Sequence, residues 1–154
     1  MYVDANLEFS NAQAVTATAL ATNVVDLQPQ SERLNALQNI GIGEEAYLVV
    51  QTQTAATDTG SDATLTVTLE SADDAGITTN AQVHFSTGAL AFAAFSPAGS
   101  KVAVVKLPQH LAYRRFLGVR YTVANGPLTA GAFDAFITKD VQAQQYMKPG
   151  YTTA

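Results

Sequence analysis

The sequence predicts an all-β fold, an antiparallel β-sandwich or jelly roll, and three observations favour it. Thr and Val are abundant, and both are β-branched residues that favour pleated, half-buried surfaces. Residues 63–70 alternate strictly between apolar and polar side chains, as a strand with one buried face does. Turn-forming residues separate many short runs of this kind, which is typical of sandwiches and jelly rolls. A chain of 154 residues fits one domain, and we expect residues 1–154 to form it.

The remaining strands are predicted in chain order from their own patterns. Residues 45–54 begin apolar on both faces and become polar, as expected of a strand that leaves a sandwich interior toward its rim. Residues 115–124 place Leu117, Val119 and Tyr121 on one face. Residues 101–107 and 131–140 are further strands. Less regular patterns at 23–27, 82–85 and 89–94 predict weaker strands.

Helix signals are confined to residues 30–38, where Pro29 precedes a possible N-cap at Ser31 and Leu34 and Leu37 share a face. We expect at most one short helix there. The Ala/Thr-rich stretch 12–22 has little pattern, so residues 1–22, like residues 140–154 at the other end, can extend from the domain as arms.

Charge is distributed unevenly along the chain. Residues 1–100 carry eleven acids and one base, a net charge of −10, whereas residues 101–154 carry seven bases and two acids, a net charge of +5. We expect acidic and basic strands to lie side by side in the sheets and to neutralise each other. The alternative is that the folded protein has an acidic end and a basic end, which bind opposite charges on a partner. A net charge of −5 disfavours nucleic acid as a partner.

Composition also limits location and chemistry. The chain has no cysteine, so disulfides and Cys-based metal sites are excluded. Its first residues include acids where a signal peptide needs bases, and no apolar run approaches the roughly 20 residues of a membrane helix. We therefore expect a soluble protein made in the cytoplasm, without a membrane partner.

Catalytic constellations are difficult to assemble from these residues. Nucleophilic catalysis would need Ser or Thr paired with His84 or His110, and no Gly-x-Ser-x-Gly elbow occurs. We interpret His110 as a loop residue and His84 as a satisfied sheet side chain. The Gly41-Ile-Gly-Glu-Glu-Ala46 stretch matches a dinucleotide pattern but precedes a strand, so it indicates a tight turn. We expect no enzyme activity and no cofactor.

Two acidic turns could supply oxygen ligands to a hard cation such as calcium. The first contains Asp58 and Asp62, and the second contains Asp73, Asp74 and Asn80. Neither has the ligand spacing of an EF-hand loop. Solvated turn acids are therefore the favoured interpretation, with no metal expected.

The stretch Asn125-Gly-Pro127 sends two conflicting signals. Asn-Gly between apolar runs favours a two-residue β-hairpin, in which both turn residues have φ > 0. The next residue would donate its N–H across the hairpin, and Pro127 has none. We therefore predict a longer loop, with strands ending near Ala124 and resuming around Ala130. Asn125, Pro127 and Leu128 would form a contact tip in which Leu128 is tucked under the loop or offered to a neighbour.

Both ends of the chain carry apolar side chains that are costly to leave in water, so they either pack on the domain or wait for a neighbour. With the tip residues they complete the set of candidate partner contacts: Tyr2, Phe9, Asn125, Pro127, Leu128, Tyr146, Met147 and Tyr151.

Several short segments carry a resemblance to a known family: Met1-Tyr-Val-Asp4 with Ala12-Gln-Ala-Val-Thr16, Ile40-Gly-Ile-Gly-Glu44 with Tyr47-Leu-Val-Val-Gln51, and Tyr121-Thr-Val123, Thr129-Ala-Gly-Ala-Phe133 and Asp140-Val-Gln-Ala143. Taken together, the chain resembles the capsid cement proteins of tailed bacteriophages over nearly its whole length. Residues 28–39 look like an insertion relative to that family.

The resemblance implies a jelly-roll protein on the outside of an icosahedral capsid in the virion. It would join neighbouring major capsid proteins, as a homodimer at two-fold positions, and it would need no catalytic residues. The alternative function is a carbohydrate-binding or receptor-binding β-sandwich module, which would need an exposed aromatic platform.

Overall fold

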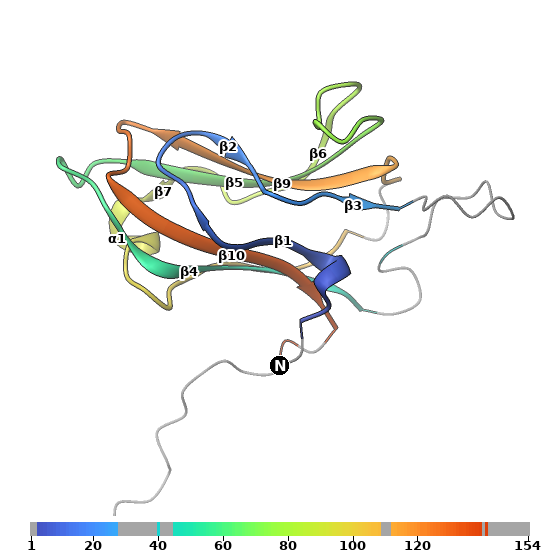
Figure 1. Ribbon diagram of the computed structural model, residues 1–154, viewed down its shortest axis with the longest axis horizontal. Helices are drawn as coiled ribbons and strands as arrows, with labels where there is room; N and C mark the ends of the chain where they lie inside the picture. Colours follow the sequence, from blue (N-terminus) through green and yellow to red (C-terminus); the bar gives the residue numbers. More distant parts are fainter. Residues whose placement is uncertain (1–2, 28–39, 41–44, 109–111, 140, 142–154) are drawn as a thin grey trace, which may run out of the picture.

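The computed structural model describes residues 3–27, 40, 45–108, 112–139 and 141, and these form two antiparallel β-sheets packed face to face (Figure 1). The all-β sandwich prediction is therefore confirmed. The first sheet has the order β1 (Glu8–Ala14), β10 (Ala130–Thr138), β4 (Tyr47–Thr57) and β8 (Lys101–Lys106). The second is built on β9 (Phe116–Ala124) and β5 (Thr64–Ala72), flanked by β2 (Ala19–Leu20), β3 (Val25–Asp26), β6 (Gln82–Ser86) and β7 (Leu90–Ala91).

The order of the strands is that of a jelly roll. Strands β2 and β3 both pair with β9, and β6 and β7 both pair with β5, so each pair fills one strand position. The second sheet then reads β2/β3-β9-β5-β6/β7 opposite β1-β10-β4-β8. The chain crosses between sheets from β1 to β2, β3 to β4, β4 to β5, β7 to β8, β8 to β9 and β9 to β10. Two such sheets of four strand positions are the jelly-roll architecture.

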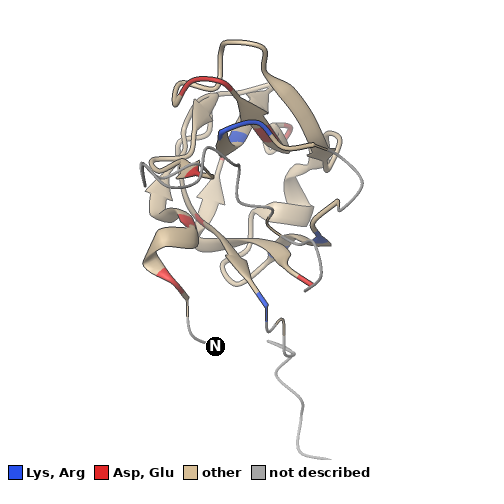
Figure 2. Ribbon diagram, turned by 90° about the vertical axis from the view of Figure 1, so that its right-hand side faces the viewer, with Lys and Arg blue, Asp and Glu red and all other residues tan. Residues whose placement is uncertain are grey.

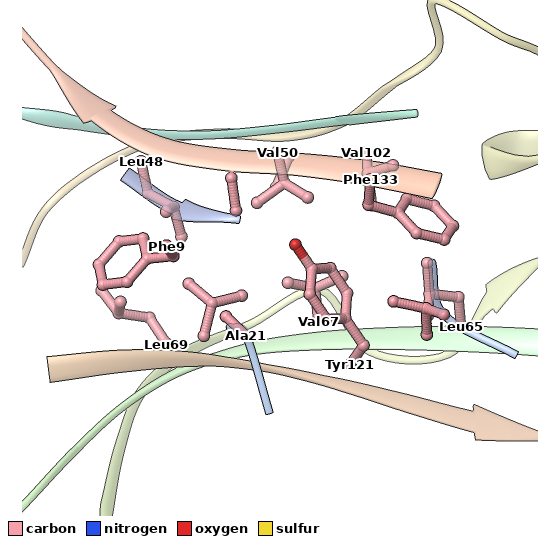
Figure 3. Close-up of a cluster of buried hydrophobic side chains, with 14 of the residues drawn as sticks. Phe9, Ala21, Leu48, Val50, Leu65, Val67, Leu69, Val102, Tyr121 and Phe133 are labelled. Atoms are coloured by element: carbon pink, nitrogen blue, oxygen red, sulfur yellow. The ribbon is translucent and has the colours of Figure 1, made fainter. Parts of the chain in front are cut away.

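The core lies between the two sheets (Figure 3). The alternation in β5 works as its sequence predicts: Leu65, Val67 and Leu69 are fully buried, and the threonines between them are partly exposed. Opposite them, Phe133 of β10 packs against Tyr121 of β9 with ring centroids 5.6 Å apart. Burial of these apolar side chains is the main force that holds the sheets together.

The N-terminal segment is part of the domain, which corrects the expectation that residues 1–22 form an arm. Strands β1 and β2 lie within it, a 3-10 turn (η1, Ala5–Leu7) precedes them, and Phe9, Val15 and Ala21 are buried core residues. The pairing of β1 with β10 contains two register shifts, and Ala12 has a φ of 47°. These irregularities break the period-2 pattern that would identify the strand.

Residues 89–94, predicted as a strand, are a strand only at Leu90–Ala91 and then form a helical turn, α1 (Phe92–Phe95). Phe95 is fully buried, and its carbonyl oxygen accepts a hydrogen bond from the Thr52 hydroxyl at 2.6 Å. Burial of Phe95 in the core therefore favours a helical turn here in place of a continued strand. The helix expected at residues 30–38 and the arm expected at 140–154 lie outside the described residues, apart from Val141. Within the part that is described, no helix is long and apolar enough to cross a membrane.

Candidate functional site

The loop between β9 and β10 contains Asn125-Gly-Pro127 and joins the two sheets, so it is not a hairpin turn. Its strands end at Ala124 and resume at Ala130, which confirms the predicted longer loop. Asn125 has a φ of 59°, a left-handed conformation that Asn tolerates better than most residues. Gly126 is needed for a close approach, because a Cβ there would come within 3.1 Å of the Ala63 Cβ.

Hydrogen bonds fix this loop to its neighbours. The Leu128 N–H donates to the Thr16 carbonyl at 2.9 Å, and the Thr129 N–H donates to the Thr57 carbonyl at 2.7 Å. The hydroxyl oxygens of Thr57 and Thr129 lie 2.7 Å from each other and form a third hydrogen bond. Leu128 is 2 % exposed, so it anchors the loop from beneath. The loop is thus held in one conformation by the segments on either side.

The end of the sandwich at the left of Figure 1 presents a surface that we call the loop end. It is defined by the connections 15–18, 58–63, 96–100 and 125–129. These connections contain no Lys or Arg, and Asp58 and Asp62 are their only acids. Their exposed residues are small: Thr, Ala, Gly, Ser, Asn and Pro, with Asp62. A surface of this kind loses little side-chain entropy and little charge hydration when it is covered.

The structure separates the candidate contact residues into three groups. Asn125 and Pro127 are exposed at the loop end, as predicted. Phe9 and Leu128 are 0 % and 2 % exposed, so neither is a surface contact; for Leu128, this is the predicted alternative in which it is tucked under the loop. Each lies in the core because its neighbours cover it: Phe9 belongs to β1, and Leu128 is tucked under its loop. The remaining candidates lie outside the described residues: Tyr2, Tyr146, Met147 and Tyr151.

Figure 2 shows that Lys, Arg, Asp and Glu residues are present at the opposite end of the sandwich. Among the described residues, four ion pairs each join a base of residues 101–154 to an acid of residues 1–100, as the predicted local neutralisation requires, and Arg120–Glu70 joins the neighbouring strands β9 and β5. They are Lys106–Glu45 at 2.6 Å, Arg114–Asp73 at 2.9 Å, Arg115–Asp26 at 2.9 Å and Arg120–Glu70 at 3.0 Å.

The acidic turns are held by donors of the protein itself. The Asp58 carboxylate accepts the N–H groups of Asp62 and Ala63, both at 3.1 Å. The Asp74 carboxylate accepts the N–H groups of Gly76, Thr78 and Thr79, and these bonds lower its pKa to about 2. Among the described residues, no group of three or more His, Cys, Asp or Glu side chains is placed to hold a metal ion.

A serine–histidine contact lies in the second sheet, which sequence patterns did not identify as a pair. The oxygen of Ser71 is 2.6 Å from His84 Nε2. Ser71 is fully buried and His84 is 9 % exposed, so a substrate cannot reach the hydroxyl. No carboxylate orients the imidazole, because its Nδ1 has no hydrogen-bond partner in the described structure. This geometry lacks the third member of a catalytic triad.

An open groove of about 540 Å³ lies between η1, the start of β1 and β3. Leu7, Val24 and Ile40 contribute apolar lining, and Asn6, Glu8 and Asp26 contribute polar lining. Asp26 already pairs with Arg115. The groove therefore offers a mixed surface without a converging set of polar groups.

Comparison with known proteins gives one family. The family model described as Bbp16 matches residues 9–137, which span β1 to β10 and hence both sheets. No curated protein matches the chain.

Proposed function

We propose that this chain, which belongs to the Bbp16 family, is a structural virion protein that binds the outer surface of an icosahedral phage capsid. It cements neighbouring major capsid proteins and stabilises the expanded shell. The resemblance of its sequence segments to capsid cement proteins supports this proposal, and the family match covers most of the same chain. The protein acts by contact and catalyses no reaction.

The loop end is the observation that carries the proposal. Four connections between the sheets form this surface of small residues with two acids, and hydrogen bonds tie 125–129 to 15–18 and tie both 125–129 and 96–100 to β4. A fixed surface pays a smaller ordering cost when it binds than a mobile one does. The central part of a protein interface is usually depleted of charge, as this surface is. These properties suit docking onto another protein.

The mechanism follows from binding two subunits at once. A protein that contacts two neighbouring capsid proteins binds the assembled lattice more tightly than loose subunits, so its binding free energy favours the assembled state. A homodimer at a two-fold position would present two such surfaces to the shell. The protein is made in the host cytoplasm and faces outward in the virion, where its negative net charge of −5 stays away from the packaged genome.

The alternative of a carbohydrate-binding or receptor-binding module receives no comparable support. Such a module needs an exposed aromatic platform. The large hydrophobic side chains exposed in the described part of the chain are Val3, Val83 and Val104, none of which is aromatic. A glycan array would detect such binding directly.

The proposal is tested by adding the purified protein to expanded capsids that lack it and to unassembled capsid protein. We expect co-sedimentation with the capsids, a rise in their melting temperature and little affinity for the unassembled subunit. Equal affinity for capsids and subunits would contradict the mechanism, because the lattice would then gain nothing from binding.

Two matched variants locate the contact. Ala17→Glu adds a charge at the loop end, and Ala75→Glu adds the same charge to the β5–β6 loop; both alanines are exposed. We expect Ala17→Glu to weaken capsid binding by about tenfold or more, because the carboxylate must be desolvated in the interface. Ala75→Glu should bind like the unsubstituted protein. The reverse result would move the contact surface to the other end of the sandwich.

A further inference from the structure

His84 occupies an irregular position in the edge strand β6. Phe85 pairs with Leu69 and Val83 pairs with Glu70, so His84 is the extra residue of a β-bulge. A bulge redirects a side chain, and here the imidazole is 9 % exposed in a strand whose other residues are partly or fully exposed. It contacts Ser71 of β5 and the ring of Tyr113, whose centroid is 4.5 Å away.

The hydrogen bonds around Ser71 fix the proton on the imidazole. The Ser71 oxygen accepts the backbone N–H of Arg114 at 3.0 Å. The serine hydrogen then has one acceptor among the described residues, His84 Nε2 at 2.6 Å. Unprotonated Nε2 accepts this hydrogen, and the neutral ring then carries its own hydrogen on Nδ1, a buried atom without a hydrogen-bond partner among the described residues. Ser71 thus joins three segments of the chain, β5, β6 and the approach to β9, through one hydroxyl.

Protonation of Nε2 would break this arrangement. The ring nitrogen would become a donor to the second lone pair of the Ser71 oxygen, and the serine hydrogen would lose the acceptor that it has among the described residues. The new imidazolium would also be buried, which is unfavourable without a paired anion.

The charged groups nearby do not compensate for such a cation. Asp73 already accepts Arg114 at 2.9 and 3.1 Å and Asn80 at 2.7 Å. Glu70, next to Val83 across the β5–β6 ladder, already pairs with Arg120 at 3.0 Å. The Arg114 guanidinium adds like charge to the same corner, and the Tyr113 hydroxyl, whose pKa burial raises to about 12, stays neutral.

We propose that neutral His84 is a latch that holds the edge strand β6 and the approach to β9 against β5, and that protonation of its imidazole releases β6 locally. This is a response to acid within the fold, and it does not depend on the proposed capsid function.

The acid range of this release is set by the pKa of His84 in the closed and open forms. Burial lowers the pKa of His84 below its ordinary value of 6.5, so the open form takes up a proton first as the pH falls below 6.5. The contribution of the latch is complete above 6.5 and is lost once the pH falls through the lower pKa of the folded state. The Asp74 carboxyl, with a pKa of about 2, keeps its turn intact to much lower pH.

Hydrogen exchange at about pH 7.5 and about pH 5 tests the latch. After correction for the intrinsic pH dependence of exchange, we expect the β6 amides to lose up to about tenfold in protection per pH unit, since one proton is coupled to opening. Amides of β4 should keep their protection. Unchanged protection of β6, or an equal loss in β4, would overturn the proposal.

Two substitutions assign the response to this histidine. His84→Gln places a non-titrating amide oxygen within reach of Ser71 and should remove the acid response of β6, whereas His110→Gln, which removes the other histidine, should retain it. If His84→Gln fails to fold, an NMR titration of His84 in the unsubstituted protein decides the question. A midpoint below 6.5 supports the latch, and a midpoint at or above 6.5 overturns it.

Discussion

Tyr121 is the largest fully buried side chain among the described residues, and it extends from the second sheet across the core to the first sheet. Its hydroxyl oxygen lies 2.7 Å from the Ser10 oxygen, so a hydrogen bond joins β9 in one sheet to β1 in the other. Burial raises the pKa of Tyr121, which keeps the phenol protonated. A hydrogen bond in an apolar core adds little net stability when both partners are present. Removing one partner is destabilising, because the other polar group stays buried without a hydrogen bond.

We therefore expect a strong coupling between these two residues. Tyr121→Phe leaves the buried Ser10 hydroxyl without its partner and should lower the free energy of unfolding by about 1–3 kcal/mol. Ser10→Ala should cost a similar amount by leaving the phenol unpaired. The double substitution should cost clearly less than the sum, because both polar groups leave together. Urea unfolding of the four proteins measures the coupling, and additive losses would contradict it.

At the scale of elements, the β5–β6 loop is folded back onto the outer face of the second sheet. Ile77 has a φ of 50°, which is unusual for a β-branched residue, yet it is only 2 % exposed. Three contacts hold it: the carboxylate of Asp74 caps the turn, Arg120 donates to the Ile77 carbonyl at 3.0 Å, and the side chain rests above Gly118.

Gly118 is therefore required by packing in the middle of β9. A Cβ there would come within 3.0 Å of Ile77 Cγ1 and 3.3 Å of Val24 Cγ1. We expect Gly118→Ala to lower the free energy of unfolding by about 1–3 kcal/mol through overpacking.

Truncating the loop side chain provides the control for Gly118→Ala. Ile77→Ala opens space where the new methyl group would lie, so Gly118→Ala should cost less in that background than in the unsubstituted protein. Thermal or urea unfolding measures both differences. An equal cost in the two backgrounds would show that the strain lies in the strand rather than against Ile77.

The regular strands could be predicted from sequence because their side chains alternate between a core and a solvent face. Strand β5 was expected at residues 63–70 and is observed at Thr64–Ala72, and β9 was expected at 115–124 and is observed at Phe116–Ala124. Strand β1 could not be recognised, since two register shifts interrupt its period. The helical turn α1 could not be predicted from the sequence, because burial of Phe95 in the core, and not local propensity, determines its conformation.

The candidate site was predictable only where the backbone is constrained locally. Pro127 lacks an N–H, so a two-residue turn was excluded and the longer β9–β10 loop was predicted correctly. Burial of Leu128 and Phe9 depends on contacts with Thr16 and with the opposite sheet, which lie far away in the sequence. The Ser71–His84 contact likewise depends on the bulge in β6, and the sequence contains no pattern that predicts this bulge.

At the scale of the whole molecule, the uneven charge of the chain is resolved by its topology. The jelly roll places segments of the basic second half beside segments of the acidic first half, and four ion pairs result among the described residues. These pairs differ in burial. The side chains of Arg120 and Glu70 are 29 % and 9 % exposed, whereas those of Lys106 and Glu45 are 44 % and 60 % exposed.

Burial predicts that equivalent substitutions at the two pairs have unequal effects. Arg120→Met leaves the Glu70 carboxylate buried without its cation and should lower the free energy of unfolding by about 2–3 kcal/mol. Lys106→Met should have a much smaller effect, since water solvates both partners of that exposed pair. Adding Glu70→Gln to Arg120→Met should recover part of the loss, because a neutral amide is cheaper to bury than a carboxylate. Equal losses for Arg120→Met and Lys106→Met in urea unfolding would mean that burial does not govern the energetic cost of removing these charges.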